Sequence, residues 1–323
     1  MEKVDVAVIG GGPAGLAAAL SARRSGAERV LLIERERQLG GVLNQCIHNV
    51  FGRTRYGEAV TGPEYADRLI RETDGAGIEF LLHTSVLSVS PKRKLLCTGA
   101  ESGLREYSAG SVILASGCRE RPRGSLAISG TRPAGIYTAG TAQYLINIQG
   151  LRLGQNVVIF GDNAAGLAIV EPLKLMGASV VLIASPKAYA ALPEAELPAR
   201  LDDRDIPIYP RHTLTHIDGY PHITSVTLQR VDESGARIRG TEEVLPCDTL
   251  LLAQEMLPEN KLAREAGAAW DEKSGTLRVD QNLESSLAGI FLCGNAAKIH
   301  KTTDAIVREA EKVGSCAARA AKA

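Results

Sequence analysis

The first 34 residues predict a strand, a glycine-rich turn, a helix and a second strand that ends in an acid. Residues 4–9 form a β-branched apolar run, typical of a strand buried in a parallel sheet. The turn at residues 10–15 reads G-x-G-x-x-G, and an Ala- and Leu-rich helical segment follows to Arg24. Residues 30–33 predict another buried strand directly before Glu34. This order is typical of a dinucleotide-binding βαβ unit of about 30 residues.

The turn glycines have separate physical roles. Gly10 permits the tight turn, Gly12 lets a pyrophosphate approach the backbone, and Gly15 lets helix and strand pack closely. The helix N-terminus offers N–H groups and a partial positive charge to the phosphates. Glu34 stands where a carboxylate accepts hydrogen bonds from an adenosine ribose. We therefore predict a dinucleotide site here.

Composition narrows the class of protein. The 323 residues suffice for two domains, and 37 basic residues balance 37 acidic ones, which gives no support for binding to nucleic acid or a membrane surface through bulk charge. No apolar stretch approaches the roughly 18 residues of a membrane span, and the N-terminus runs directly into a strand, so we expect no signal peptide. The six cysteines form no C-x-x-C pair, which predicts no metal site and a cytoplasmic protein with reduced thiols.

The first unit recurs 151 residues later in the chain. Gly161 and Gly166 take the places of the first and third turn glycines, and apolar runs at residues 157–160 and 180–183 flank them. An internal match of this kind predicts two nucleotide-binding folds in one chain.

The second copy departs from the pattern. Asn163 replaces the middle glycine, Ser185 replaces the acid, and Pro172 lies inside the expected helix, where it favours a kink. Two interpretations stay open: the domain is retained for structure and binds no nicotinamide nucleotide, or loss of the acid beside Lys187 favours the 2′-phosphate of NADP. If the site is merely eroded, glycine at 163 together with glutamate at 185 should improve NADH affinity.

The remaining segments predict an α/β fold of two Rossmann-like domains, the second inserted in the first. Residues 249–253 are interpreted as the return toward the first domain, so that residues 1–118 and 251–323 form the first domain and 119–250 the second. Residues 188–205 are expected to be partly helical. Helices are predicted at residues 62–73, 141–148 and 305–320, and strands at residues 83–89, 94–98, 105–107, 111–117, 206–217, 223–231, 237–244 and 289–295.

The whole pattern resembles the flavoproteins with two dinucleotide-binding domains, the superfamily that includes the thioredoxin reductases. The glycine turn with Glu34 matches their FAD fingerprint, and residues 115–117 match the Ala-Thr-Gly motif before the crossover. Residues 289–295 match the second FAD motif, with Asn295 in the place of the usual Asp. The resemblance implies FAD in the first domain and NAD(P) in the second, subject to the changes described above.

Three stretches carry a closer resemblance, namely residues 40–49, 117–124 and 130–143. They are similar to the flavoprotein subunits that accompany bacterial glycerol-3-phosphate dehydrogenase, and to the FAD subunits of dye-linked proline dehydrogenase, opine oxidase and hydrogen cyanide synthase. This implies an FAD-dependent oxidoreductase that transfers electrons as one subunit of an amino acid, opine or glycerol-3-phosphate dehydrogenase complex. An oligomer with a partner dehydrogenase or oxidoreductase subunit is expected, acting on a small-molecule substrate or a nicotinamide nucleotide.

Two other functions stay open. One is a stand-alone NAD(P)H-dependent flavin oxidase or reductase, and the other is a non-catalytic scaffold that binds a nucleotide.

The resemblance also implies which residues bind the cofactor. The N-terminus of the last helix is expected at the flavin, where it would stabilise an anionic reduced ring. The implied cofactor contacts are Gly10, Gly12, Pro13, Ala14, Gly15, Glu34, Arg35, Gly41, Val42, Leu43, Asn44, Val86, Ala115, Ser116, Gly117, Gly294, Asn295, Thr303, Asp304 and Ala305.

No catalytic residue is fixed by the pattern, and Cys46, His48 and His300 are the candidates. Cys46 lies where disulfide reductases of this superfamily begin the helix with their redox pair, but Leu43 and His48 stand in the places of that pair. Cys46 is therefore either a reactive thiol or a packed one. His48 is a candidate proton donor near the flavin or a structural residue. His300, in the loop before the last helix, is a candidate contact for a substrate or partner.

Overall fold

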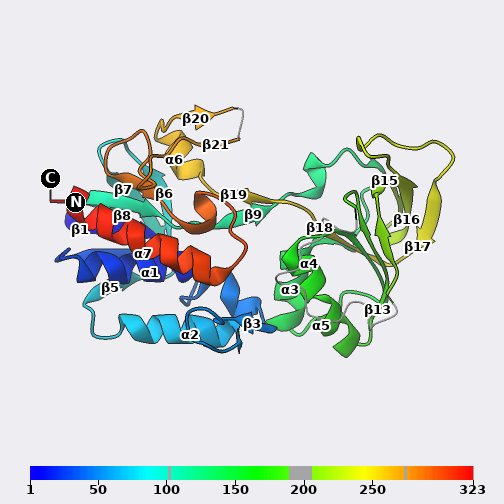
Figure 1. Ribbon diagram of the computed structural model, residues 1–323, viewed down its shortest axis with the longest axis horizontal. Coiled ribbons are helices and arrows are strands. Elements are labelled where there is room, and N and C mark those ends of the chain that lie inside the picture. Colours follow the sequence, from blue (N-terminus) through cyan, green and yellow to red (C-terminus); the bar gives the residue numbers. More distant parts are fainter. Residues whose placement is uncertain (101–102, 189–205, 273–274, 323) are drawn as a thin grey trace. The chain divides into compact units, whose positions relative to one another are not determined.

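The computed structural model describes residues 1–100, 103–188, 206–272 and 275–322, and the chain divides into two compact units (Figure 1). Unit 1 comprises Met1–Arg119 and Pro258–Ala323, and unit 2 comprises Glu120–Leu257. The second unit is thus inserted in the first, and both contain parallel sheets, which confirms the predicted fold class. The expected helix within residues 188–205 falls, beyond Ala188, outside the described residues.

Unit 1 is organised by a sheet whose central strands run parallel. Along it lie, in order, β5 (Ile78–Leu81), β2 (Val30–Ile33), β1 (Glu2–Ile9), β8 (Gly103–Leu114) and β22 (Ile290–Leu292). The antiparallel strands β7 (Lys94–Gly99) and β6 (Thr84–Val89) continue the sheet from the first half of β8. On one side of the sheet the strands follow in chain order outward from β1, as β2 and then β5. On the other side the next parallel strand outward from β8 is β22. The carboxyl ends of β1 and β8 are therefore a topological switch point, where α/β sheets bind ligands.

Each face of this sheet has its own core. Val6, Val8 and Ile113 point to the face covered by α1 (Pro13–Arg24), α2 (Gly62–Thr73) and α7 (Thr303–Ala320). Ala7 and Ile9 point to the other face, which packs against β6, β7 and the short helix α6 (Lys261–Glu265). This alternation with a period of two residues is why the strand reads as apolar throughout.

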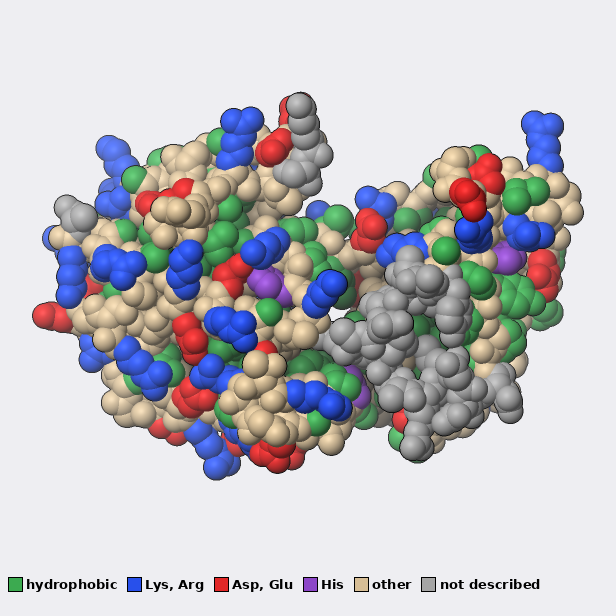
Figure 2. Space-filling view, viewed as in Figure 1, with side chains coloured by type: hydrophobic (Ala, Val, Ile, Leu, Met, Phe, Trp, Pro, Cys, Tyr) green, Lys and Arg blue, Asp and Glu red, His purple; other side chains and the backbone are tan. Residues whose placement is uncertain are grey.

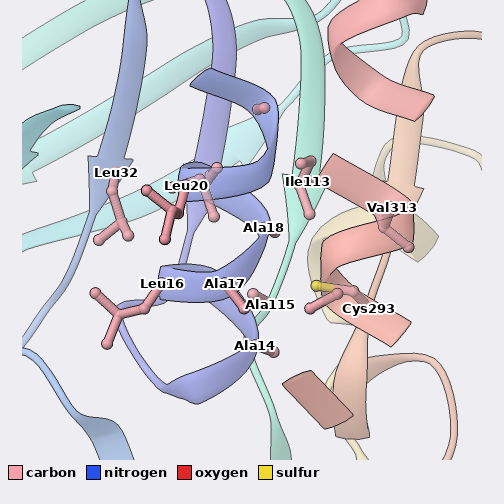
Figure 3. Packing of buried hydrophobic residues seen from close by; sticks show 14 of the residues in the cluster. Ala14, Leu16, Ala17, Ala18, Leu20, Leu32, Ile113, Ala115, Cys293 and Val313 are labelled. Carbon is pink, nitrogen blue, oxygen red and sulfur yellow. The ribbon is translucent and has the colours of Figure 1, made fainter. Parts of the chain in front are cut away.

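Small residues let α1 and α7 pack closely. Figure 3 shows Cys293 between α1, which carries Ala14, Ala17 and Ala18, and α7, and all four residues belong to one buried cluster with Val313 of α7. At Gly314 of α7, an added Cβ would lie 2.2 Å from the carbonyl oxygen of Ala18. The distance between the two helices is therefore set by backbone contact.

Unit 2 contains two sheets. The parallel sheet has the order β11 (Ile136–Thr138), β18 (Thr249–Ala253), β12 (Asn156–Gly161), β13 (Ser179–Ser185) and β14 (Ile208–Pro210). One face packs against the helices α3 (Ala139–Asn147), α4 (Ala164–Ala168) and α5 (Val170–Leu175). The other face packs against a second sheet, with the order β10 (Ser129–Gly130), β15 (His212–Gly219), β16 (Ile223–Arg230) and β17 (Glu243–Pro246). Pro172 lies in the first turn of α5, where its missing N–H is tolerated, and the predicted helix is split there.

Short strands complete the described fold: β3 (Asn49–Phe51), β4 (Val60–Thr61), β9 (Cys118–Glu120), β19 (Met256–Pro258), β20 (Trp270–Asp271) and β21 (Thr276–Leu277).

The predicted return of the chain at residues 249–253 is wrong. These residues form β18, which pairs with β11 and β12 inside unit 2, and the chain re-enters unit 1 only at Pro258. The boundary placed between residues 250 and 251 is corrected accordingly. A wholly apolar run fits the middle of any parallel sheet, so its residues do not show which sheet it joins. Residues 105–107 and 111–117 are likewise expected as separate strands, but β8 runs unbroken through Gly103–Leu114.

We predict that Gly314→Ala destabilises the protein. In mid-helix, alanine stabilises the folded state by about 1 kcal/mol relative to glycine through helix propensity. Overpacking against a backbone carbonyl, which cannot change rotamer, destabilises it by about 1–3 kcal/mol. The clash with the Ala18 carbonyl should prevail and lower the melting temperature by a few degrees, measured by thermal unfolding. Arg308→Ala, on the exposed side of the same helix, is the control and should leave the melting temperature unchanged. An unchanged or raised value for Gly314→Ala would contradict the role of backbone contact.

Candidate functional site

Four loops meet at the carboxyl edge of the unit 1 sheet. Ile9 of β1 pairs in register with Ile33 of β2 and Leu114 of β8, and Leu114 pairs with Leu292 of β22. The residues that follow these strands are therefore level with one another. This edge brings together the predicted contacts of the glycine turn and those that follow the three neighbouring strands: Glu34, Arg35, Ala115, Ser116, Gly117, Gly294 and Asn295.

The three fingerprint glycines differ in what surrounds them. A Cβ at Gly15 would lie 1.7 Å from the carbonyl oxygen of Gly10, and one at Gly10 would lie 2.5 Å from that of Ala115. Both glycines are thus required by packing of the protein on itself. At Gly12, by contrast, a Cβ would meet among the described residues only the Cα of Gly41, at 3.9 Å. The fold itself does not need glycine at position 12, so the open space there fits a ligand at the N-terminus of α1.

The N-terminus of α1 is open toward this space. Gly12 is its N-cap residue, and among the described residues no side chain caps the helix. Pro13 occupies the first helical position, where its lack of an N–H is harmless. The N–H groups of the first turn and the positive end of the helix dipole therefore face the cradle formed by Gly12 and Gly41, and this combination suits a pyrophosphate.

Glu34 borders the same cradle. Its side chain is buried, and its carboxylate accepts hydrogen bonds from the backbone N–H of Gly11 (2.6 Å) and of Glu36 (2.8 Å). These bonds fix the carboxylate at the end of β2 and leave acceptor capacity for a ribose hydroxyl. Arg35 beside it is exposed and pairs with Glu36 at 3.4 Å, an arrangement expected of a surface residue.

The segment after β2 lies over the glycine turn. The backbone N–H of Gly40 donates to the carbonyl of Gly11 (2.8 Å), and a Cβ at Gly41 would lie 3.0 Å from the Cα of Gly12. Asn44 donates from Nδ2 to the carbonyl of Leu39 (2.9 Å) and so holds the loop in shape. The other predicted contacts nearby differ in exposure: Leu43 is buried, Val42 is exposed, and Val86 is half-buried in β6.

Cys46 and His48 follow this segment. The Cys46 thiol contacts the carbonyl oxygen of Val42 at 3.3 Å, and the Cys46 carbonyl accepts from the N–H of Gly62 at the start of α2. His48 lies against the Phe51 ring at 5.1 Å between centroids, and burial lowers the pKa of its imidazole. A lowered pKa favours the neutral ring, so His48 resembles a packed residue more than a proton donor.

The loop after β22 contains a cluster of polar side chains. Asn295 Oδ1 accepts from the backbone N–H of His300 (2.9 Å) and lies 3.3 Å from His300 Nδ1. His300 Nε2 lies 3.1 Å from Glu309 Oε2, and Lys298 Nζ lies 2.9 Å from the same oxygen. Glu309 Oε1 accepts from the N–H of Gly294 (3.2 Å). Asn295 therefore holds its own loop in place, a role the sequence did not indicate.

The N-terminus of α7 is engaged by the protein. Thr302 is its N-cap and accepts from the N–H of Ala305, and Thr303 begins the helix. The Asp304 carboxylate accepts from the hydroxyl of Tyr65 (2.8 Å) and from the backbone N–H groups of Thr54 (2.9 Å) and Arg55 (3.2 Å). Burial and the neighbouring Asp304 raise the pKa of Tyr65, which keeps it a hydrogen-bond donor. Asp304 thus anchors the loop before β4, whatever else it contacts.

In unit 2 the packing glycines of the fingerprint are kept. A Cβ at Gly161 would lie 2.0 Å from the Ala253 carbonyl oxygen, and one at Gly166 would lie 2.2 Å from the Ala253 Cβ. Position 163, which corresponds to Gly12, carries a side chain that closes the turn. Asn163 Oδ1 accepts from the N–H of Gly166 (2.8 Å) as the N-cap of α4, and its Nδ2 donates to the Gln254 carbonyl (2.8 Å).

A carboxylate is also present at this turn, from a residue that the internal repeat did not single out. Asp162 accepts from Ser185 Oγ (2.7 Å) and pairs with Lys187 Nζ (3.0 Å). Ser185 stands at the position of Glu34, so the acid has moved from the strand end to the turn. Asp162 takes the place of Gly11, and this acid within the glycine turn is the signal that was missed.

Two residues with ion pairs between separate segments of unit 1 were also missed. Glu309 lies in α7, about two turns after the cap Thr302. Arg55 lies in an irregular loop, where it pairs with Glu72 (2.6 Å) and Glu311 (2.9 Å). Neither residue belongs to a motif, so only the three-dimensional structure reveals its partners.

Other classes of site receive no support from the described residues. They contain no group of three or more His, Cys, Asp or Glu side chains able to hold a metal ion, and no helix long and apolar enough to cross a membrane. Figure 2 shows basic and acidic side chains interspersed over the visible face of unit 1, in keeping with the equal numbers of the two charges.

We predict a pH-dependent contribution of Glu309 to stability. Burial raises the pKa of this carboxyl, but hydrogen bonds from His300 and Lys298 prevail and lower it below its usual value near 4.3. The ionised form then stabilises the fold by about 1–2 kcal/mol at neutral pH, and this is lost as pH falls below about 4.

Urea unfolding of wild type and Glu309→Gln measures this effect. The difference between their midpoints should be largest at neutral pH and shrink at low pH. Glu265→Gln, which removes only an exposed ion pair with Lys261, should change the midpoint little at any pH. A difference for Glu309→Gln that is independent of pH would contradict the prediction.

Comparison with known proteins places the chain in a family. The model of the pyridine nucleotide-disulphide oxidoreductase family matches residues 4–313. The chain is 25% identical to an opine oxidase subunit from Agrobacterium tumefaciens (strain Ach5), over 99% of this chain and 65% of that protein. It is 32% identical to the alpha subunit of sarcosine oxidase from Corynebacterium sp. (strain P-1), over 55% of this chain and 19% of that protein. The chain thus spans less than two thirds of the length of these curated relatives.

Comparison with solved structures supports the same fold. The crystal structure of thioredoxin reductase from T. acidophilum superimposes with a TM-score of 0.78 at 18% identity, covering 100% of both chains. This likeness confirms the expected two-domain Rossmann architecture. The chain therefore belongs to the pyridine nucleotide-disulphide oxidoreductase family.

Proposed function

We propose that the chain is the FAD-bearing electron-transfer subunit of a dehydrogenase complex of the amino acid, opine or glycerol-3-phosphate type. Its electrons are exchanged with a partner subunit, and not with a nicotinamide nucleotide held by unit 2. The observation that carries this proposal is the closed turn of unit 2, where Asn163 caps the helix that a pyrophosphate would otherwise approach.

The two glycine turns differ in whether they leave room for a nucleotide: the turn of unit 1 is open and the turn of unit 2 is closed. In unit 1 the position of Gly12 is open and the first turn of α1 has no side-chain cap among the described residues. In unit 2 the equivalent Asn163 satisfies the N–H of Gly166 from within the chain. A nucleotide there would have to displace that bond and fit around a side chain, which makes phosphate binding unfavourable.

The ribose position of unit 2 supports the same conclusion. Asp162 is held by Ser185 and by Lys187, so its carboxylate already has two partners. Lys187 is in turn neutralised by Asp162, which weakens its attraction for a 2′-phosphate. Both NADH and NADPH therefore lack the contacts that the fingerprint provides in unit 1.

Unit 1 provides what FAD needs. The cradle of Gly12 and Gly41 with the N-terminus of α1 would hold the pyrophosphate, and Glu34 would hold the adenosine ribose. The other contacts proposed from the resemblance surround the same sheet edge or begin α7. Bound FAD supplies the two-electron chemistry of its isoalloxazine ring, while the chain orients it and sets the charge around it.

The relatives support a partner subunit. The matched opine oxidase and sarcosine oxidase proteins are both named as subunits of larger oxidases. We therefore propose that this chain also acts in an oligomer with a partner dehydrogenase or oxidoreductase subunit. We also propose a reducing compartment such as the cytoplasm, in which cysteines remain thiols.

We predict that Gly12→Val releases FAD without unfolding the protein. The backbone at Gly12 has an ordinary extended conformation and its Cβ direction is open, so valine fits the apoprotein but fills the cradle. Flavin absorbance per purified chain should fall to near zero, while apoprotein melting temperatures of variant and wild type should agree. Normal flavin occupancy in this variant would contradict the assignment of the cradle. Gly15→Val, the comparison, should unfold the protein because of its backbone clash.

The electron route is tested by anaerobic stopped-flow absorbance. The FAD-loaded protein is mixed with NADH, with NADPH, and with dithionite as a positive control. We expect slow or no bleaching of the flavin band by either nucleotide and full bleaching by dithionite. Rapid bleaching by a nucleotide would instead identify a stand-alone NAD(P)H oxidase or reductase.

A restored variant makes the same test sharper. Glycine at 163 and glutamate at 185 alone would set the new glutamate against the Asp162 carboxylate, which lies 2.7 Å from Ser185 Oγ. We therefore propose Asp162→Gly, Asn163→Gly and Ser185→Glu together, with the two-residue variant Asn163→Gly, Ser185→Glu as its matched control. The triple variant should bind NADH at least tenfold more tightly than wild type, and the control should gain less. Equal NADH affinities in all three proteins would contradict the closed turn.

A further inference from the structure

His300 lies between two oxygen acceptors. Its Nε2 is 3.1 Å from Glu309 Oε2, and its Nδ1 is 3.3 Å from Asn295 Oδ1. The orientation of the Asn295 amide is fixed, because the same Oδ1 accepts from the His300 backbone N–H. A neutral imidazole has one N–H and can donate to only one of these oxygens, whereas an imidazolium donates to both. The site is thus shaped to receive a second proton on the ring.

The Glu309 carboxylate places a negative charge next to the imidazole ring of His300. Glu309 in α7 faces Nε2, and it is shared with the exposed ammonium group of Lys298 from the same loop. The buried thiol of Cys293, at the end of β22, lies near Glu309, and burial followed by that charge raises its pKa, so it stays neutral. On the Nδ1 side the partner is the amide of Asn295, which donates from its Nδ2 to the thiol of Cys118 at 3.7 Å.

The replacement of the usual Asp by Asn295 matters here. A carboxylate at that position would leave His300 between two anions, which favours the imidazolium. The amide offers an acceptor without a charge. With the Glu309 carboxylate on one side of the ring and a neutral amide on the other, a further negative charge that appears nearby would favour the imidazolium.

The loop that carries His300 lies at the sheet edge where the proposed function places FAD. This loop follows β22, whose carboxyl end is level with that of β8 at the switch point of the sheet. Gly294 at the start of this loop is enclosed by Ala14 in the first turn of α1 and by Ile306 in the first turn of α7, at 2.8 and 3.1 Å from an added Cβ. The loop therefore borders the cradle in which the proposed function places FAD.

We propose that His300 takes up a proton when the bound flavin is reduced, and that Asn295 and Glu309 position its ring to accept it. The proposal rests on the FAD site in unit 1. A positive charge at His300 would stabilise the anionic reduced flavin, as fixed donors and charges do in sites that exclude water.

The exchange is balanced as follows. Two electrons come from an external reductant, here dithionite, which is oxidised. Bound FAD would take up these electrons with one solvent proton and would then carry one negative charge. A second solvent proton binds to the imidazole of His300, so the pair of flavin and histidine gains two electrons and two protons together.

The test counts protons taken up per two electrons during anaerobic reduction of the full-length, FAD-loaded protein. At about pH 8 a free histidine is neutral, and reduced flavin in water is an anion. Wild type should take up two protons and His300→Gln only one. His222→Gln, at an exposed histidine of unit 2, is the matched control and should keep the count of two. Equal counts in wild type and His300→Gln, at equal flavin occupancy, would overturn the proposal.

Two further measurements keep the test decisive. Should His300→Gln not fold, Asn295→Asp replaces it, since a second carboxylate should hold the ring protonated in both redox states and reduce the count to one. An unchanged count of two would overturn the proposal. Nitrogen NMR of labelled histidine should also show the His300 ring gaining a proton on reduction. If purified wild type contained and bound no FAD, the cofactor site itself would be overturned. If NADH bleached the flavin band, only the proposed electron route would be overturned.

Discussion

The backbone contact of Gly15 with Gly10, and of Gly10 with the Ala115 carbonyl, fixes the first turn of α1 at the edge of the sheet. These contacts leave no room for a side chain, and they set where the helix N-terminus points. Packing of α1 on α7 through Gly314 then fixes how closely the two helices approach. The contacts of Gly294 with Ala14 and Ile306 bring the first turns of both helices to the switch point between β1 and β8. The site is thus a consequence of close backbone packing, with its polar groups added to a rigid frame.

The second unit keeps the frame and changes the polar groups. Gly161 and Gly166 meet Ala253 as Gly10 and Gly15 meet their own neighbours, so the same contact between strand and helix recurs. The position that faces a ligand is different, because Asn163 caps its own helix. A domain retained for structure would keep its packing contacts and lose its ligand contacts, as unit 2 does. We therefore propose that the electrons arrive from a partner subunit.

Much of this could be predicted from the sequence because the signals are local. The order of strand, glycines, helix and acid specifies unit 1, and the shifted repeat specifies unit 2. Partners distant in the chain could not be predicted. Ser185 reads as a lost acid, yet Asp162 brings a carboxylate to the same place. Asp304 and Asn295 read as cofactor contacts, yet their side chains hold loops that only the fold brings near. The run at β18 could not be assigned to a sheet, because its apolar residues fit either one.

The proposed electron route depends most on the closed turn of unit 2. Equilibrium titration of the FAD-loaded chain with NADH, followed by nicotinamide fluorescence and by calorimetry, tests it most directly. A closed turn predicts no saturable binding up to about 1 mM, the upper end of ordinary KM values for enzymes. Saturable binding of one NADH per chain at micromolar concentration would contradict it, and would show that Asn163 and Asp162 form a working nucleotide site of a different kind.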